Sequence, residues 1–248
     1  MKYIASCSFG KDSLATILLA IEHGDPLDAV VWSEVMFSHA DNISGEMPEH
    51  VEWIYGTAIP KLEGMGVKVN VVRAKRDYES FFQTTIIRGK RKGKVHGFVL
   101  GGMCMANRVL KVKPIDDYFR QYGDEEIIKY IGIAIDEPKR LERLEGNKVS
   151  LLEKYGYTEL MAKQKCKEYD LLSPIYQYNT RGGCWFCPNC GYKTFALFKK
   201  KHPDLWQRLL DLGKTTNLCS NGFKYGETID SVDRRIDAMN RQLELDLF

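Results

Sequence analysis

The chain has 248 residues, of which 44% are hydrophobic and 28% are charged. These proportions are typical of a globular protein with one large domain, or one domain and a small appendage, and they exclude a fibrous or disordered chain. The 36 basic and 33 acidic residues leave a formal net charge of +3, which is too small to identify a partner. The longest nearly apolar run, residues 14–21, is far shorter than the ~20 residues of a membrane helix, and the first residues lack the pattern of a signal peptide. We therefore expect no membrane partner and a cytoplasmic location.

Strand and helix patterns alternate along the first part of the chain. Residues 2–7 predict a buried strand, and residues 14–21 carry apolar side chains at helical spacing. A second helix is predicted over residues 48–62, and further strands at residues 29–32, 67–72 and 130–135. Alternating elements of these lengths predict an α/β fold, in which a parallel twisted sheet has helices on both faces, as in Rossmann-like proteins. Ligand sites of such folds lie at the carboxyl ends of the strands.

The pattern becomes helical after residue 136. Helices are predicted at residues 139–145, 158–169, 203–212 and 231–245. This shift in pattern predicts two parts, an α/β nucleotide-binding domain over residues 1–145 and a helical C-terminal region over residues 146–248.

A strongly basic loop is predicted at residues 88–94, which contain five lysines and arginines, two glycines and no apolar residue. Such a loop can be a solvated surface turn. It can also contact the phosphates of a nucleotide or of a nucleic acid. The sequence leaves both interpretations open.

A candidate phosphate-binding loop lies where the first predicted strand ends and the first helix begins. It consists of Ser8, Phe9, Gly10, Lys11, Asp12 and Ser13. Free backbone amides and the helix dipole make such a junction an anion site, and Lys11 adds a positive charge. Asp12 would cap the helix or help to hold a divalent cation. The spacing of the glycines fits neither the Walker pattern nor the dinucleotide-binding pattern.

The loop resembles the Ser-Gly-Gly-Lys-Asp-Ser fingerprint of the PP-loop ATP pyrophosphatase superfamily, with Phe9 in place of the first glycine. This substitution is common in the branch related to phosphoadenosine phosphosulfate (PAPS) reductases. Three later segments are similar to that branch, residues 104–114, 132–140 and 183–188. The matches together extend from residue 4 to about residue 212. The resemblance implies a fold like that of the adenine nucleotide alpha hydrolases.

The resemblance also implies site residues. ATP, with Mg²⁺, would bind at residues 8–13, where Lys11 and Asp12 would be catalytic, and four more residues would contact the nucleotide or acceptor: Lys111, Lys113, Asp136 and Arg140. If residues 110–113 are extended, both lysines lie on one face, which suits a polyanion. Each assignment has a simpler alternative, since the lysines could be ordinary surface charges, and Asp136 and Arg140 a helix cap and its i+4 partner.

The seven cysteines should be reduced in the cytoplasm, which favours metal or redox chemistry over disulfides. Three of them form a glycine-flanked Cys-x-x-Cys-x-x-Cys pattern of Cys184, Cys187 and Cys190. This spacing with a remote fourth ligand favours a [4Fe–4S] cluster, and structural Zn²⁺ is the alternative. Cys166 is the first choice for the fourth ligand, with Cys104 and Cys219 in reserve.

The resemblance implies an enzyme that activates an acceptor by adenylation, and the cysteine cluster favours sulfur transfer, as in the tRNA or DNA thiolation of similar proteins. No cysteine follows Cys219, so the C-terminal catalytic cysteine of assimilatory PAPS reductases has no counterpart. Binding or reduction of PAPS or adenosine phosphosulfate is one alternative, and a non-catalytic nucleotide- or nucleic-acid-binding module with structural zinc is another. The expected partners are an adenine nucleotide and a tRNA or DNA acceptor, with a homodimer as a candidate assembly; the sequence does not identify the sulfur donor.

Overall fold

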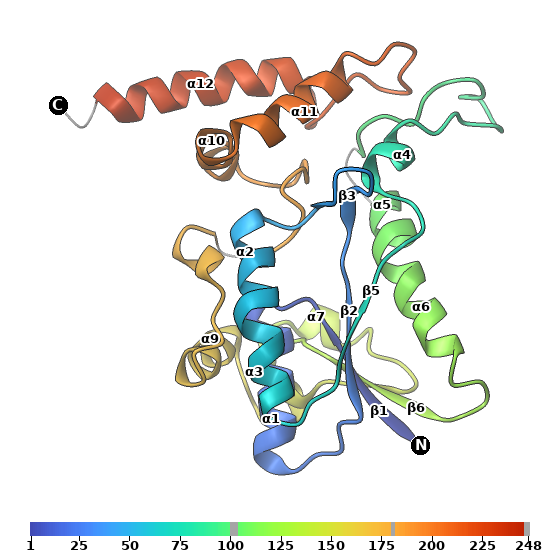
Figure 1. Cartoon of the computed structure of the whole chain (residues 1–248), viewed down its shortest axis with the longest axis vertical. Helices are drawn as coiled ribbons and strands as arrows, with labels where there is room; N and C mark the ends of the chain where they lie inside the picture. The colour runs from blue at the N-terminus through green and yellow to red at the C-terminus, as the bar shows by residue number, and fades with distance from the viewer. Residues whose placement is uncertain (100–103, 180–181, 246–248) are drawn as a thin grey trace. The chain divides into compact units, whose positions relative to one another are not determined.

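The computed structural model describes residues 1–99, 104–179 and 182–245 (Figure 1). The chain has an α/β fold with a five-stranded parallel sheet flanked by helices, together with a C-terminal helical region. It divides into two compact units. Unit 1 comprises residues 1–34, 46–74 and 111–182, and unit 2 comprises residues 35–45, 75–110 and 183–248. The boundary near residue 145 that the sequence pattern indicates stays a prediction.

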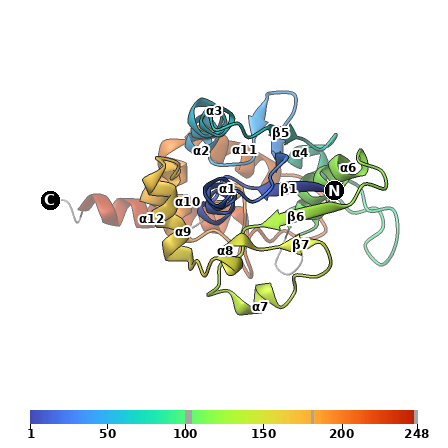
Figure 2. The same cartoon turned by 90° about the horizontal axis from the view of Figure 1, so that it is seen from below.

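Unit 1 contains the parallel sheet. Its strands are β1 (Lys2–Cys7), β2 (Ala29–Ser33), β5 (Val69–Val72), β6 (Ile127–Ile131) and β7 (Lys148–Val149), in the order β5-β2-β1-β6-β7 (Figure 2). The central strand β1 pairs with β2 on one side and with β6 on the other. The strand order therefore reverses beside β1.

Both faces of the sheet are covered, as the sequence predicts. Side chains of a β-strand alternate between the two faces. Ala5, Cys7 and Trp32 belong to the larger core, which includes the buried residues of α1 (Lys11–His23). Ile4, Val31 and Ile127 belong to the second core, against which side chains of α6 (Lys113–Arg120) pack. The continuous burial of β2 follows from this double cover.

The remaining helices of unit 1 are short. They are α2 (Pro48–Trp53), η1 (Ile54–Ala58), α3 (Ile59–Gly64), η2 (Arg108–Val112), α7 (Pro138–Leu141), α8 (Leu151–Lys154), α9 (Glu159–Glu168) and η3 (Pro174–Gln177), with η2 reaching back into unit 2. The segments η1 and η2 are π-helical, and a proline follows closely after each, Pro60 and Pro114. A proline inside a helix lacks its N–H group and crowds the carbonyl four residues earlier, and a wider turn relieves this conflict.

Unit 2 is built around aromatic side chains. Its elements are β3 (Met36–Ser38), β4 (Ile43–Ser44), α4 (Tyr78–Phe82), α5 (Met105–Asn107), α10 (Tyr192–Lys201), α11 (Pro203–Gly213) and α12 (Ile229–Leu245). Phe37 packs against Trp185 and Phe186, with ring centroids 4.5 and 5.4 Å apart. A Cβ atom at Gly45 would lie 2.9 Å from the Phe186 ring, so only glycine fits beside it. No helix of the described residues is long and apolar enough to cross a membrane.

The strand predicted at residues 130–135 is shifted in the structure, where β6 ends at Ile131. The following Gly132 passes against the beginning of α1, and a Cβ atom there would lie 2.7 Å from the Asp12 carbonyl carbon and the Ser13 amide nitrogen. This close approach explains why the apolar run continues beyond the strand. Ile133 and Ala134 are buried although they do not belong to the sheet.

Candidate functional site

The candidate site lies at the carboxyl end of β1, in unit 1. The loop of residues 8–13 follows β1, and the segment from Gly132 to Asp136 follows its neighbour β6. In parallel α/β sheets, ligands bind in the crevice where the strand order reverses, between the loops that leave the two central strands. The spatial order of the strands, β5-β2-β1-β6-β7, places that point between β1 and β6. Both predicted segments therefore lie where the fold favours a ligand.

The loop has a defined conformation. Phe9 has a φ of 54°, in the left-handed region that costs an ordinary residue about 1–2 kcal/mol. Its ring is fully buried and meets Trp32 edge to face, with centroids 5.2 Å apart, which offsets that cost. The Ser13 hydroxyl accepts from the Ser8 amide (3.2 Å) and donates to the Gly10 carbonyl (3.0 Å). Ser13 therefore shapes the loop from inside.

Lys11 is the buried cation of this site. Its Nζ atom contacts both Asp12 carboxylate oxygens at 2.9 Å and Glu159 Oε2 at 2.7 Å. Burial lowers the pKa of Lys11, but the hydrogen bonds and charges of Asp12 and Glu159 outweigh it, so the pKa is raised. Burial raises the pKa of Asp12, and Lys11 offsets part of that increase. The ammonium group therefore stays charged between two carboxylates.

Asp136 is connected to this cluster through Glu159. The Asp136 carboxylate accepts from the Glu159 amide at 3.1 and 3.3 Å, at the start of α9. The simpler alternative placed Asp136 as a cap on the helix that directly follows it, but the observed contact is with the first amide of the distant helix α9. Arg140 pairs with Glu137, at 2.5 Å. The i+4 pairing with Asp136 is therefore not the one observed.

A tyrosine hydroxyl covers the first amide of α1. The Lys11 amide donates to the Tyr176 hydroxyl over 2.9 Å, across 165 positions of sequence. Burial raises the pKa of Tyr176, so the hydroxyl is neutral at ordinary pH. The same oxygen would lie 3.2 Å from a Cβ atom at Gly10. The neutral Tyr176 hydroxyl therefore accepts the hydrogen bond that the Lys11 amide would otherwise donate to a phosphate oxygen.

A buried imidazole lies beside the loop. His50, 1% exposed, has its Nδ1 atom 2.8 Å from the Ser173 hydroxyl, while Nε2 makes no hydrogen bond of normal geometry to the described residues. Burial lowers the pKa of His50, against opposing effects of Glu46 and the Ser8 carbonyl. The ring therefore lies close to the predicted phosphate loop, with the Ser8 carbonyl beside it.

Lys111 and Lys113 do not lie on an extended strand, contrary to the condition under which they would share a face. Lys111 lies in the last turn of the π-helical segment η2, and Lys113 begins α6. Lys111 approaches the buried carboxylate of Glu46 at 3.8 Å, whereas the exposed Lys113 pairs with Asp117 one helical turn later. The alternation of apolar and basic residues from 110 to 113 is also typical of a strand. These residues are helical instead, because η2 leads directly into α6, which has Pro114 in its first turn.

Cys184, Cys187 and Cys190, here named the cysteine knuckle, lie in unit 2 on consecutive turns. The Cys187 amide donates to the Cys184 carbonyl, and the Cys190 amide donates to the Cys187 carbonyl, at 3.0 and 2.9 Å. Lys224 Nζ donates to the carbonyls of Pro188 and Cys190 at 2.5 and 2.6 Å, which fixes the turn from outside. In the described part of the chain, no three His, Cys, Asp or Glu side chains form a group that could hold a metal ion as they stand.

The cysteines considered as a fourth ligand have different surroundings. Cys166 lies in unit 1, where its thiol is fully buried and donates to the Lys11 carbonyl over 3.2 Å, and burial raises its pKa to about 12. Cys104 lies in unit 2, is exposed and begins α5. Burial raises the pKa of Tyr78, and the charges of Cys184, Cys104 and Cys187 raise it further, so these three cysteines lie in the neighbourhood of Tyr78. The choice of Cys166 stays a prediction.

Sequence reasoning missed several residues of the site, among them Glu159, Tyr176 and His50. Glu159 had a local signal, because it follows the helix-capping Thr158. Tyr176 and His50 had none, since both reach the loop through the tertiary fold. A second network missed at the carboxyl ends of β2 and β5 joins buried Glu34 to Arg73 at 2.6 Å and to Tyr55 at 2.7 Å.

The chain matches no known protein-family model and no curated protein sequence.

Proposed function

We propose that this protein is a PP-loop enzyme of the PAPS reductase-like branch, which binds ATP at residues 8–13 and transfers AMP to an acceptor. One observation carries the proposal, namely that the fingerprint loop lies at the carboxyl end of the central strand, where the strand order reverses. The left-handed backbone of Phe9 supports the resemblance, because the fingerprint has glycine at this position and glycine adopts that conformation freely.

The proposed reaction is an adenylation. An acceptor oxygen forms a bond to the α-phosphorus of ATP, the bond from that phosphorus to the bridging oxygen breaks, and pyrophosphate leaves with the electron pair. The loop amides and Lys11 would hold the phosphates and stabilise the charge that develops on the leaving group. A sulfur nucleophile from an unidentified donor would then displace AMP from a tRNA or DNA acceptor.

Asp12 and Glu159 are suited to a magnesium ion that arrives with the nucleotide. Magnesium is usually held by one or two carboxylates together with substrate phosphates. Both carboxylates contact the same ammonium group of Lys11, so the cluster carries one negative charge in excess. When bound, the ion would neutralise phosphate charge, and Lys11 would be released from the carboxylates toward the phosphates.

The decisive experiment is product analysis with ATP and bulk tRNA or DNA. AMP and pyrophosphate are the expected products, and formation of ADP would instead indicate a different nucleotide chemistry.

Binding of PAPS or adenosine phosphosulfate is the second candidate, since the same loop accepts sulfated adenine nucleotides in the family that the sequence resembles. Competition between ATP and PAPS in a titration separates the two candidates. Nucleic-acid binding without turnover of any nucleotide would support the non-catalytic module.

Tyr176→Phe is expected to bind ATP about 2- to 10-fold more tightly than the wild type. The change removes the oxygen that accepts from the Lys11 amide, so a phosphate need not displace a hydrogen bond worth about 0.5–1.5 kcal/mol. Isothermal titration measures the effect. Tyr118→Phe is the control, because its hydroxyl pairs with Tyr122 on the other face of the sheet. Weaker ATP binding by Tyr176→Phe would mean that the hydroxyl contacts the phosphates instead of competing with them.

We also propose that the knuckle binds a metal, as a [4Fe–4S] cluster or as Zn²⁺. The observation behind this proposal is the donor set itself, three thiols on consecutive glycine-flanked turns. Anaerobic purification with iron, sulfide and zinc analysis distinguishes the two metals. About four irons per chain and a brown colour are expected for a cluster, and about one zinc without colour for a structural site.

The fourth ligand is testable by serine variants. If Cys166 is the ligand, Cys166→Ser loses metal while Cys104→Ser and Cys219→Ser retain it. Loss of metal in Cys104→Ser alone would instead identify Cys104 as the fourth ligand, the cysteine that lies near Tyr78 together with Cys184 and Cys187. Full metal content in all three variants would leave three thiolate ligands and an open metal position. Thermal unfolding of each variant separates loss of metal from loss of fold, which matters most for the fully buried Cys166.

A further inference from the structure

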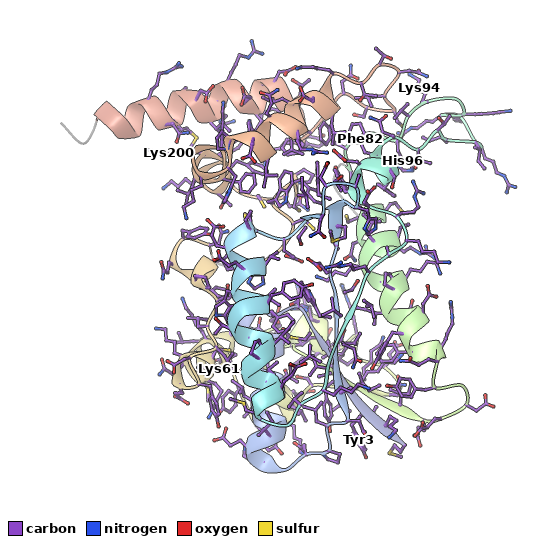
Figure 3. The ribbon with its side chains drawn as sticks, viewed as in Figure 1. Tyr3, Lys61, Phe82, Lys94, His96 and Lys200 are labelled. Carbon is purple, nitrogen blue, oxygen red and sulfur yellow. The ribbon has the colours of Figure 1, made fainter. Side chains whose placement is uncertain are left out.

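The most basic segment of the chain is an ordered hairpin in unit 2. Residues 84–97, here named the basic hairpin, form paired backbone hydrogen bonds between Ile86 and Lys94, His96 and Thr84, and Gly93 and Ile86, all at 2.8 or 2.9 Å. Figure 3 labels Phe82 and His96 at its base and Lys94 further along it. The basic loop is therefore the tip of a hydrogen-bonded hairpin.

The basic hairpin is held to the rest of unit 2 by its second strand. Val95 donates to the Asn217 carbonyl over 2.9 Å and accepts from the Cys219 amide over 2.7 Å. The Asn217 side chain donates to the Gly93 carbonyl over 2.8 Å. At the base, Phe98 packs edge to face against Phe82 and Phe223. The tip is thus supported without any use of its charged side chains.

The five cations of the tip are exposed, and none forms an ion pair with another described residue. They are Arg88, Lys90, Arg91, Lys92 and Lys94. Some other cations of unit 2 are paired, among them Lys199 with Asp233 and Asp237, and Arg208 with Asp41 and Glu79. Five like charges within seven residues repel one another, and no ion pair with a described residue offsets that repulsion. Their arrangement suits a polyanion outside the chain.

The net charge of +3 conceals a division between the units. Unit 2 contains 18 lysines and arginines against 11 aspartates and glutamates, a net charge of +7, whereas unit 1 contains 18 against 22, a net charge of −4. The basic surplus therefore belongs to the unit that carries the basic hairpin. Such clustering is the electrostatic footprint of nucleic-acid binding.

We propose that the basic hairpin binds the sugar–phosphate backbone of a nucleic acid. A regularly spaced polyanion can engage several cations of this hairpin tip and release the counterions that surround its own phosphates. An anionic membrane is the less suitable partner, because stable membrane binding needs a second, apolar anchor, and the exposed large apolar residue of the hairpin is Ile87 alone among the described residues. The proposal goes beyond the adenylation chemistry and requires neither ATP nor a metal.

The test compares two triple variants of the full chain. Lys90→Gln, Arg91→Gln and Lys92→Gln together remove three hairpin charges, whereas Lys68→Gln, Arg143→Gln and Lys148→Gln remove three exposed charges from unit 1 that have no ion pair with described residues. Fluorescence anisotropy with labelled tRNA and with a labelled DNA duplex is measured over a series of salt concentrations. The hairpin variant is expected to bind about 10-fold or more weakly at low salt, with a slope of log affinity against log salt that is smaller by about 3.

Each result has a distinct meaning. Loss with both probes identifies general backbone contacts, and loss with tRNA or DNA alone identifies which nucleic acid the hairpin engages. Unchanged affinity and slope with both probes would overturn the proposal, as would an equal loss in the unit 1 variant. Binding to phosphatidylserine vesicles is measured in parallel, and a loss confined to the vesicles would also overturn the proposal. The midpoint of thermal unfolding should not change, because the substituted side chains make no ion pair with any residue that the structure describes. Lys11→Ala should still bind nucleic acid, so failure of the nucleotide proposal and failure of this one can be told apart.

Discussion

Lys11→Ala is expected to weaken ATP binding by about 10- to 100-fold. The substitution removes a buried ammonium group that would donate to the phosphates, and a charge-assisted hydrogen bond of this kind is worth about 1.5–3 kcal/mol. It also leaves Asp12 and Glu159 without the cation that separates their charges, which adds repulsion against an anionic ligand. Isothermal titration with ATP and Mg²⁺ measures the loss.

The matched control for this prediction is Lys68→Ala. Lys68 is an exposed lysine of the same unit, without an ion pair to a described residue, so its removal should leave ATP affinity within twofold of the wild type. Gly10→Val tests the loop independently, because a side chain there would crowd the Ser8 hydroxyl at 3.4 Å and the Tyr176 hydroxyl at 3.2 Å. If Lys11→Ala and Gly10→Val both bind ATP like the wild type, the loop is not the phosphate site.

Gly132→Ala is expected to destabilise the fold by about 1–3 kcal/mol and to weaken ATP binding. The added Cβ atom would lie 2.7 Å from backbone atoms of Asp12 and Ser13, and backbone at the start of a helix cannot move aside as a flexible side chain can. Relief requires the segment after β6 to separate from α1, which would also displace Asp136 from the amide of Glu159. Urea unfolding and ATP titration measure the two effects.

Gly64→Ala is the control for this substitution. Gly64 ends α3, and a Cβ atom there meets no atom within 4 Å, so the change should be neutral or stabilise by up to about 1 kcal/mol. Equal stability and equal ATP affinity of the two alanine variants would mean that the close approach of Gly132 to α1 is dispensable. A stable Gly132→Ala that has lost ATP binding would place the role of this glycine in the site and not in the fold.

The fold and the place of the loop of residues 8–13 between β1 and α1 were predictable because their signals are local. The strand β1 and the helix α1 follow from apolar spacing within about ten residues, and the loop between them from the residues at the junction. The parallel order of the sheet follows from the alternation of strands and helices. The position of β6 was not predictable in the same way, since the buried residues after Ile131 pack on α1 and read like a continuing strand.

The sequence by itself determined that the chain folds as a parallel α/β protein with a glycine-containing loop between its first strand and its first helix, and that three closely spaced cysteines and a strongly basic segment are present. Only the tertiary structure decided what surrounds the loop. Glu159 reaches Lys11 across 148 positions, and Tyr176 reaches the amide of Lys11 across 165. The tertiary structure also decided that Lys111 lies in a helical segment. Alternating residues share one face only in a strand, so the pattern alone could not place the Lys111 side chain. Contacts of this range depend on how complete elements pack, which no short segment encodes.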